Sequence, residues 1–234
     1  YALARLWLKD GPLEAGAIAA HFGSVSAVTF IAAQQFGERS GQAPEGVLVA
    51  LVVALEIPAI LLGLTLAKRD AGLQWHQVRE VLVGKTALLL IGGMVIGAIA
   101  TKHGTDAVNL MYGQLFQGTL MLFMLDMGMV AAAQLRGLGR GAFRLVAYGI
   151  AVPIAHGLLG TALGHAAGLS PAGAAVFGTM TASASYIAAP ASVRASLPEA
   201  NVGRCITAAL GITFPFNLAI GIPTFFAFAA WLAA

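Results

Sequence analysis

The stretch HFGSVSAVTF at residues 21–30 decides how this chain can fold. It places a glycine and three hydroxyl side chains inside an apolar run, residues 13–36, that is long enough to cross a membrane. Glycine and short hydroxyl side chains allow a membrane helix to unwind locally, which exposes backbone amides and carbonyls. The stretch therefore predicts a membrane-spanning segment with a polar interruption in its middle.

The composition of the whole chain supports this prediction. Of 234 residues, 59% are apolar and only 10% are charged, and the mean hydropathy is +0.84. A soluble domain carries about 25% charged residues, because its surface must be hydrated. A soluble globular protein, a disordered segment and a nucleic-acid-binding domain are thus excluded, and no nucleic-acid partner is expected. The single cysteine, Cys205, excludes an internal disulfide.

Short polar breaks divide the chain into seven apolar runs, each near the length that crosses about 30 Å of hydrocarbon. The runs are continuous rather than alternating, which favours helices over strands. The predicted spans are residues 13–36, 46–67, 81–101, 112–135, 144–167, 172–189 and 202–232. We therefore expect an all-α, polytopic protein embedded in the lipid bilayer.

The basic residues predict how these spans are oriented. All lysines and arginines except Arg39 and Lys102 fall on one side of the predicted membrane. Cytoplasmic loops carry an excess of Lys and Arg, so that side is assigned to the cytoplasm and the last helix ends outside. The expected location is the inner (plasma) membrane, as a multi-pass protein.

Two parts of the sequence resemble each other. FGSVS at residues 22–26 is similar to FGTMT at 177–181, and Pro44-Glu45 is similar to Pro198-Glu199 at nearly the same separation. The predicted orientation places the two copies in opposite directions, and such inverted repeats are typical of secondary transporters. Residues 81–234 contain five predicted spans, whereas residues 1–80 contain two. We therefore expect an inverted-repeat transporter of five plus five helices, with the first three spans absent from this chain.

The two small-polar segments are the candidate binding site. The start of a half-helix presents free N–H groups to an anion, while hydroxyls and freed carbonyls replace water around sodium. Small residues also line ordinary contacts between membrane helices, but two related segments in an inverted repeat favour the ion site. The candidate residues are Gly23, Ser24, Ser26, Thr29, Thr179, Thr181, Ser183 and Ser185, with Ser24, Ser183 and Ser185 as sodium ligands.

Two acids, Glu56 and Asp126, fall inside predicted spans. A buried acid in a membrane is costly and points to an ion or proton pathway, although a protonated acid bonded between helices gives the same pattern. Glu56 precedes Pro58, whose missing N–H frees a carbonyl one turn back, and it is the candidate coupling acid. Asn217 is its nearest counterpart in the second copy and could equally form a hydrogen bond between helices.

Motifs of enzymes and metal proteins are not found in the sequence. It has no nucleophile elbow, Walker loop or HExxH motif, and its histidines lack metal-ligand spacing. We expect no enzyme and no resident cofactor, with sodium as the coupling ion.

Several stretches resemble the sodium-dependent bicarbonate permease family, known best from cyanobacterial carbon uptake. The resemblance runs over nearly the whole chain, and its most specific blocks are LFQGTLMLFMLDMGM (115–129) and TASASYIAAPASVRASLP (181–198). It implies ten helices in two inverted halves, a homotrimer, sodium-coupled uptake of bicarbonate and a small PII-like regulatory protein as a cytoplasmic partner.

The resemblance also extends to individual positions. Gly23, Ser24, Ser26 and Thr29 match the family's first binding segment, and Ser183, Ala184 and Ser185 match its second. Where family members have a serine triplet followed by an aspartate, this chain has Ser183, Ala184, Ser185 and Tyr186. A carboxylate that would help to hold sodium is therefore missing.

The sequence favours a secondary transporter of a small anion, with sodium-coupled uptake of bicarbonate as the leading hypothesis. Two alternatives stay open. One is proton-coupled transport of another small monocarboxylate through Glu56. The other is a membrane sensor or scaffold that transports nothing and recruits a cytoplasmic regulator through its basic loops.

Overall fold

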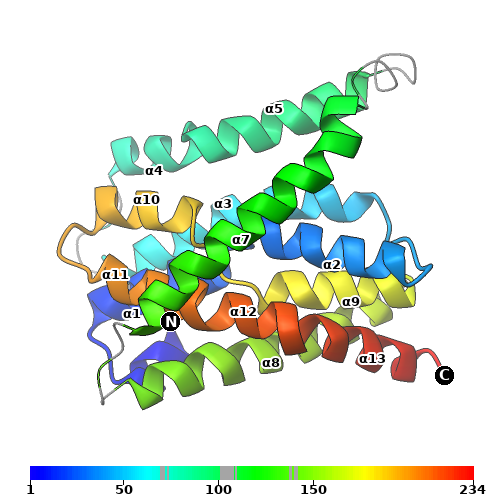
Figure 1. The fold of residues 1–234 in the computed structure, drawn as a ribbon. Helices are drawn as coiled ribbons and strands as arrows, with labels where there is room; N and C mark the ends of the chain where they lie inside the picture. Colours follow the sequence, from blue (N-terminus) through cyan, green and yellow to red (C-terminus); the bar gives the residue numbers. More distant parts are fainter. Residues whose placement is uncertain (69–71, 73, 101–107, 109, 137–138, 140–141) are drawn as a thin grey trace.

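The computed structural model describes residues 1–68, 72, 74–100, 108, 110–136, 139 and 142–234 (Figure 1). Regular secondary structure in these residues is helical throughout, which confirms the predicted all-α class. The first helices are η1 (Ala4–Leu8), α1 (Pro12–Gly23), α2 (Ala27–Arg39), α3 (Val47–Ala67), α4 (Trp75–Leu82) and α5 (Lys85–Ile99). The later ones are η2 (Leu110–Gln114), α7 (Leu115–Arg136), α8 (Phe143–Ala166), α9 (Pro171–Ala182), α10 (Ala188–Ser196), α11 (Val202–Ile206), η3 (Thr207–Thr213), α12 (Phe214–Phe216), η4 (Asn217–Gly221) and α13 (Ile222–Leu232).

Five of the predicted spans are confirmed by length and composition. In the described part of the chain, the helical runs that are long and apolar enough to cross a membrane are Pro12–Arg39, Val47–Ala67, Leu110–Arg136, Phe143–Ala166 and Val202–Leu232. The first of these contains the short interruption between α1 and α2. Lys102, which the orientation argument assigned to the outer side, lies outside the described residues.

Of the other two predicted spans, 81–101 is wrong as a continuous helix, whereas 172–189 is interrupted at the small-polar segment where the sequence predicted local unwinding. The first divides at Gly84, whose extended backbone (φ −61°, ψ 151°) separates α4 from α5, and residue 101 lies outside the described residues. The second divides after Ala182, so that a non-helical segment separates α9 from α10. Hydropathy measures how apolar a stretch is, and it does not register whether the backbone continues as a helix.

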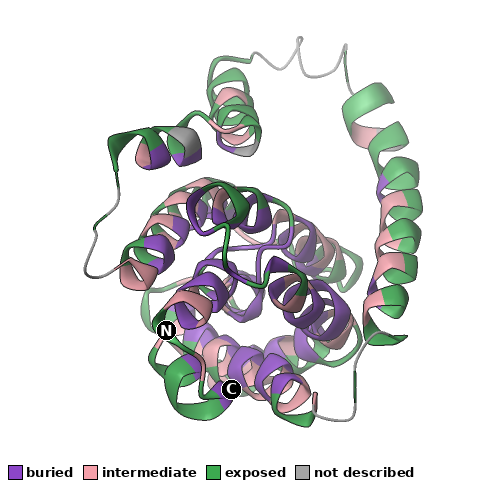
Figure 2. Ribbon diagram, turned by 90° about the vertical axis from the view of Figure 1, so that its left-hand side faces the viewer, coloured by how far each residue is buried: buried purple, intermediate pink, exposed green. Residues whose placement is uncertain are grey.

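Most of the buried side chains lie in one bundle that contains α1 to α3 and α8 to α13. Figure 2 looks along this bundle and shows buried residues gathered inside it. Outside it, α5 packs on α3 and α7 packs on η3. Large apolar side chains are exposed on these two outer helices, for example Leu89, Ile96, Leu122 and Leu125. Such surfaces are expected where a protein meets lipid rather than water.

The closest packing in the bundle depends on small residues. Gly63 on α3 faces Ala20 on α1, and a Cβ added to Gly63 would lie 2.5 Å from the Ala20 backbone nitrogen. Helices in membranes associate through such close backbone approach, because lipid supplies no hydrophobic force between them. The contact holds α3 against α1 just before the chain reaches the interruption at residues 24–26.

We expect the substitution Gly63→Leu to separate α1 from α3 and to destabilise the protein by about 1–3 kcal/mol or more, as overpacking does. The measurement is the midpoint of thermal unfolding of the purified protein in detergent. Gly92→Leu on α5 is the matched control, because a Cβ there meets no atom within 4 Å. Equal midpoints for the two variants would contradict the packing argument.

Candidate functional site: the crossing of two interrupted helices

The first interruption lies between α1 and α2. Ser24 and Ser26 have extended backbone conformations, and α2 begins at Ala27. The Ser26 hydroxyl oxygen accepts a hydrogen bond from the Thr29 amide (3.3 Å) and another from the Thr29 hydroxyl (3.1 Å). Ser26 is therefore the N-cap of α2, which explains why serine and threonine occur at this spacing.

The second interruption lies between α9 and α10. Ser183 follows the end of α9 in an extended conformation (φ −80°, ψ 166°), and α10 begins at Ala188. The Ser185 hydroxyl oxygen accepts a hydrogen bond from the Ala189 amide at 3.2 Å. In both interruptions a serine thus satisfies an amide in the first turn of the helix that follows.

The two interruptions are hydrogen-bonded to each other. The Ser26 amide donates to the Ser183 hydroxyl oxygen at 2.9 Å, and the Ser185 amide donates to the His21 carbonyl at 2.8 Å. We call this junction of residues 21–29 and 179–190 the crossing. Figure 1 shows α2 beside α9 in one half of the bundle and α10 on the side of α1 in the other, so the two interrupted helices run in opposite directions.

The structure changes which residues of the two segments correspond. The sequence match aligned Ser24 with Thr179, whereas in the structure Ser24 and Ser183 each follow directly on the end of a helix. The helices that they follow, α1 and α9, both begin with a proline. The residue of the second segment that corresponds to Ser24 is therefore Ser183, which lies one helical turn after Thr179.

The crossing brings together two helix starts and two helix ends, because α1 ends and α2 begins at one interruption and α9 ends and α10 begins at the other. Both α2 and α10 begin here, and the start of a helix carries unsatisfied N–H groups and a partial positive charge. Residues 21–29 and 179–190 contain no aspartate or glutamate. Among the described residues, no three His, Cys, Asp or Glu side chains form a metal-binding group. Any cation at the crossing would thus be held by hydroxyl, amide and carbonyl oxygens.

Several buried polar atoms at the crossing have no hydrogen-bond partner. They are the Ser24 hydroxyl, the Tyr186 hydroxyl, the Asn217 Oδ1 atom and the His21 Nε2 atom. The side chains are almost fully enclosed, with 1% of Ser24 and 8% of Tyr186 exposed. Buried polar groups in proteins are nearly always paired with protein or water. A group of unpaired atoms around one junction indicates a place where a ligand or water binds.

Asn217 and Tyr186 are the residues whose part in the site sequence reasoning missed. The Asn217 amide nitrogen donates to the Ala182 carbonyl at 2.9 Å, which confirms the interhelical hydrogen bond, while its Oδ1 atom has no hydrogen-bond partner. Tyr186 packs its ring edge-on against Phe214, with ring centres 5.3 Å apart. In the sequence, the position of Tyr186 directly after Ser185 indicates only the loss of a carboxylate and not a hydroxyl group in the site.

Not every predicted site residue takes part in the hydrogen bonds between the two interruptions. The Thr179 hydroxyl donates to the Ala175 carbonyl inside α9, and the Thr181 hydroxyl donates to the His156 carbonyl on α8 at 2.8 Å. The hydroxyl of Thr179 is thus bonded within its own helix, and that of Thr181 is bonded to a neighbouring helix. Gly23 ends α1 where a Cβ would lie 3.3 Å from Ala59, and Ala184 is buried in the core.

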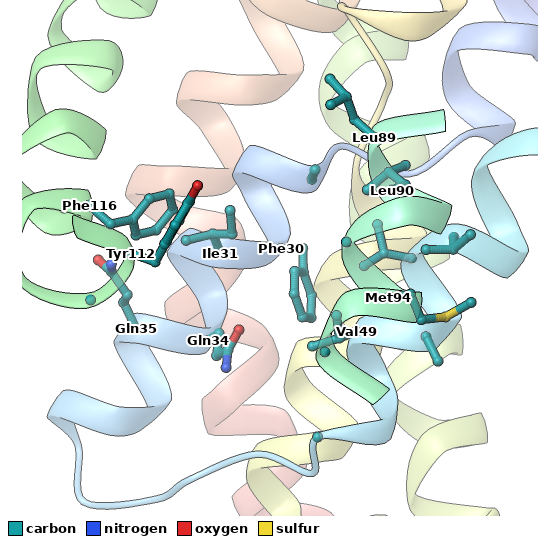
Figure 3. Close-up of a pocket in the computed structure, with 18 of the residues that line it drawn as sticks. Phe30, Ile31, Gln34, Gln35, Val49, Leu89, Leu90, Met94, Tyr112 and Phe116 are labelled. Atoms are coloured by element: carbon teal, nitrogen blue, oxygen red, sulfur yellow. The ribbon is translucent and has the colours of Figure 1, made fainter. Parts of the chain in front are cut away.

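A cavity of about 770 Å³ leads to the crossing along α2. It begins at Ala27, the first residue of α2, and continues past Phe30 and Gln34 to Glu38. Figure 3 shows that α3, α5, η2 and the start of α7 form the remaining walls, with Val49, Leu90, Tyr112 and Phe116 on their respective surfaces. The predicted orientation places the Glu38 end toward the outside.

A second cavity, of about 290 Å³, begins at the first residue of α10. Ala188 and Ser192 form its α10 wall, and Glu56 on α3 forms another. Glu56 is 5% exposed and its Oε2 atom has no hydrogen-bond partner. The structure thus places Glu56 beside α10 rather than among the hydrogen bonds of the crossing. Asp126, the other acid within a span, is exposed on α7.

Carboxylates connect the helices at both ends of the bundle, which sequence reasoning did not predict. At one end the Glu45 Oε1 atom accepts a hydrogen bond from the Ser170 amide at 2.6 Å, before the first turn of α9. Burial raises the pKa of the Glu45 carboxyl and the hydrogen bonds from Ser170 lower it; the net result is a pKa below the ordinary value. At the other end the Glu14 Oε1 atom accepts from the Asn201 amide at 2.9 Å, and Asp10 pairs with Arg204 at 2.8 Å.

A comparison with protein families shows to which family the chain belongs. The family model of the Na⁺-dependent bicarbonate transporter superfamily matches residues 1–230 of the chain. The chain belongs to this superfamily. A search of the curated proteins found no match. Membership confirms the resemblance drawn from the sequence and makes the chain a membrane transporter.

In this superfamily member, we expect Ser183→Ala to leave the buried Ser26 amide without a partner. An unsatisfied buried donor costs about 1–3 kcal/mol, so the thermal unfolding midpoint in detergent should fall. Thr119→Ala is the control, because that hydroxyl donates to the Leu115 carbonyl on the exposed helix α7. Unfolding of Ser183→Ala at the wild-type midpoint would show that the hydrogen bond between the interruptions contributes nothing.

Proposed function

We propose that the crossing binds a small anion together with sodium, and that the transporter takes up bicarbonate by sodium coupling. The observation that carries the proposal is the meeting of two helix N-termini, those of α2 and α10, at a buried junction that contains no carboxylate. Free N–H groups at the start of a helix are suited to anions. The name of the superfamily supports bicarbonate as the anion and sodium as its partner.

The anion would lie between the first turns of α2 and α10. The amides of Ser26 and Ser185 are already engaged within the crossing. The amides of Ala27 and Ala188, the first residues of α2 and α10, belong to first turns in which no intrahelical acceptor exists. The Tyr186 hydroxyl, which has no protein partner, is a further donor beside them.

Sodium would be held by oxygen atoms of the same junction. The predicted ligands are Ser24, Ser183 and Ser185, and the structure adds the unpaired Oδ1 atom of Asn217. A cation and an anion bound together form a neutral pair, which lowers the cost of crossing a medium of low dielectric constant. Since Tyr186 adds no negative charge, the bound anion itself would supply the charge that retains sodium.

Alternating access would use the two cavities in turn. One begins at Ala27 and follows α2, and the other begins at Ala188 and follows α10. The pairs Glu45–Ser170 and Glu14–Asn201 lie at opposite ends of the bundle and would open in alternation as the interrupted helices move against their neighbours. We further propose the inner membrane as the location, a homotrimer as the assembly, and a PII-like regulator at the cytoplasmic face.

The test is uptake of labelled bicarbonate by the full-length transporter in proteoliposomes, with and without a sodium gradient. We expect uptake that requires sodium and that falls at least tenfold in Ser26→Leu and in Ser183→Leu, because leucine fills the junction and removes a cap or an acceptor. Leu122→Ala, on the exposed face of α7, is the control and should transport like the wild type.

Other outcomes would favour the alternatives. Uptake that follows a proton gradient without sodium, and that Glu56→Gln abolishes, would establish proton-coupled transport of an anion. Normal binding of a cytoplasmic regulator with no transport of bicarbonate or of other small monocarboxylates would establish a sensor or scaffold. Sodium-independent uptake that neither leucine substitution alters would overturn the proposed mechanism.

A further inference from the structure

The cavity beside α10 contains a buried acid that the proposed function does not use. Glu56 lies in the middle of α3, a helix of 21 residues whose other residues are apolar or small apart from Thr65. Its side chain is 5% exposed, and its Oε2 atom has no hydrogen-bond partner. An ionisable side chain inside a membrane helix is costly to retain and marks an ion or proton pathway.

The surroundings of Glu56 restrict what can bind there. The cavity walls come from α3, α4, α5 and α10, and apart from Glu56 the described lining residues include one charged side chain, Lys85. Ser192 on α10 supplies a hydroxyl, but its oxygen donates to the Ala188 carbonyl at 3.3 Å. A metal cation would lack ligands here and would be repelled by the lysine. A proton requires no ligand set beyond the carboxylate.

Among the residues whose side chains the structure describes, the other titratable groups on the neighbouring helices lie outside the lining of this cavity. These groups are Glu14 and His21 on α1, His76 and Arg79 on α4, and Arg194 on α10. Lys85 is exposed at the start of α5, on the side that the basic residues assign to the cytoplasm. Water on that side can therefore reach the cavity through its mouth.

We propose that Glu56 is a proton-binding site, reached from the cytoplasmic side, whose charge controls how strongly the crossing holds its anion. The link is α10, because Ala188 both begins this helix and lines the cavity. An ionised Glu56 offsets the positive potential at the start of α10, where the transported anion would bind. Protonation of Glu56 removes its negative charge, so the anion then interacts with the full positive potential at the start of α10 and binds more tightly.

The inference rests on the proposed function only in assuming that an anion binds at the crossing. The first part of its test therefore measures the protonation of Glu56 without substrate. Infrared spectroscopy of the full-length transporter, between about pH 6.5 and 8.5 where buried carboxyl groups can titrate, follows the band of a protonated carboxyl group. We expect a band that grows as the pH falls and that Glu56→Gln removes. Asp126→Asn is the matched control, since it deletes an acid from an exposed position on α7, and it should leave the band unchanged.

The second part measures binding of bicarbonate in the presence of sodium over the same pH range, at constant calculated bicarbonate concentration. In the wild type we expect affinity to rise about threefold to tenfold from the high to the low pH, the size of a favourable charge effect at a helix end. Glu56→Gln should show the high affinity at every pH, and Asp126→Asn should follow the wild type.

A third variant covers the case in which Glu56→Gln does not fold. Lys85→Gln keeps the acid and changes an exposed side chain, and we expect it to move the midpoint of the infrared titration to higher pH because it removes a positive charge from the cavity. A titrating band that persists in Glu56→Gln, or a midpoint that Lys85→Gln leaves unmoved, overturns the proton site. If the band behaves as expected while bicarbonate does not bind at any pH, the proton site stands, the control of the anion is overturned and the proposed function fails separately.

Discussion

The reciprocal hydrogen bonds between the two interruptions are the constraint on which the rest of the structure depends. A membrane offers no water to a backbone amide, so a helix can break there only if the freed groups find partners inside the protein. Here the Ser26 amide pairs with Ser183 and the Ser185 amide pairs with the His21 carbonyl, so each break supplies what the other lacks. Neither interruption is satisfied without its partner, and this requirement fixes where α1, α2, α9 and α10 lie.

The same arrangement explains why the ionisable groups lie where they do. The starts of α2 and α10 supply free N–H groups at the centre, together with the carbonyl ends of α1 and α9, and residues 21–29 and 179–190 contain no acid. Acids occur instead at the bundle ends, where Glu14 and Glu45 accept hydrogen bonds from backbone amides of Asn201 and Ser170, and in one side cavity at Glu56. The junction itself therefore contains no carboxylate. The carboxylates that would separate from their partners during motion (Glu14 and Glu45), or take up a proton (Glu56), lie around it.

Much of this could be predicted from the sequence, because apolar runs and small-polar segments report membrane spans and interruptions directly. The stretch at residues 21–30 predicted the break before α2, and Ser24, Ser26, Ser183 and Ser185 all lie at the junction. The register of the repeat could not be derived, because Thr179 and Ser183 are both small hydroxyl residues one turn apart and only the backbone shows which one follows the helix end. The contacts of Tyr186, Asn217, Glu14 and Glu45 could not be predicted either, because their partners lie far away in the sequence and no local pattern contains them.

The most direct test of the central claim is an experimental density map of the full-length transporter prepared with sodium and bicarbonate, compared with a map prepared without them. Ordered density should appear between the first turns of α2 and α10, within hydrogen-bond reach of the Ala27 and Ala188 amides and of Ser24, and should vanish in the second map. A crossing that is empty in both maps, with ligand density elsewhere in the transporter, would contradict the account.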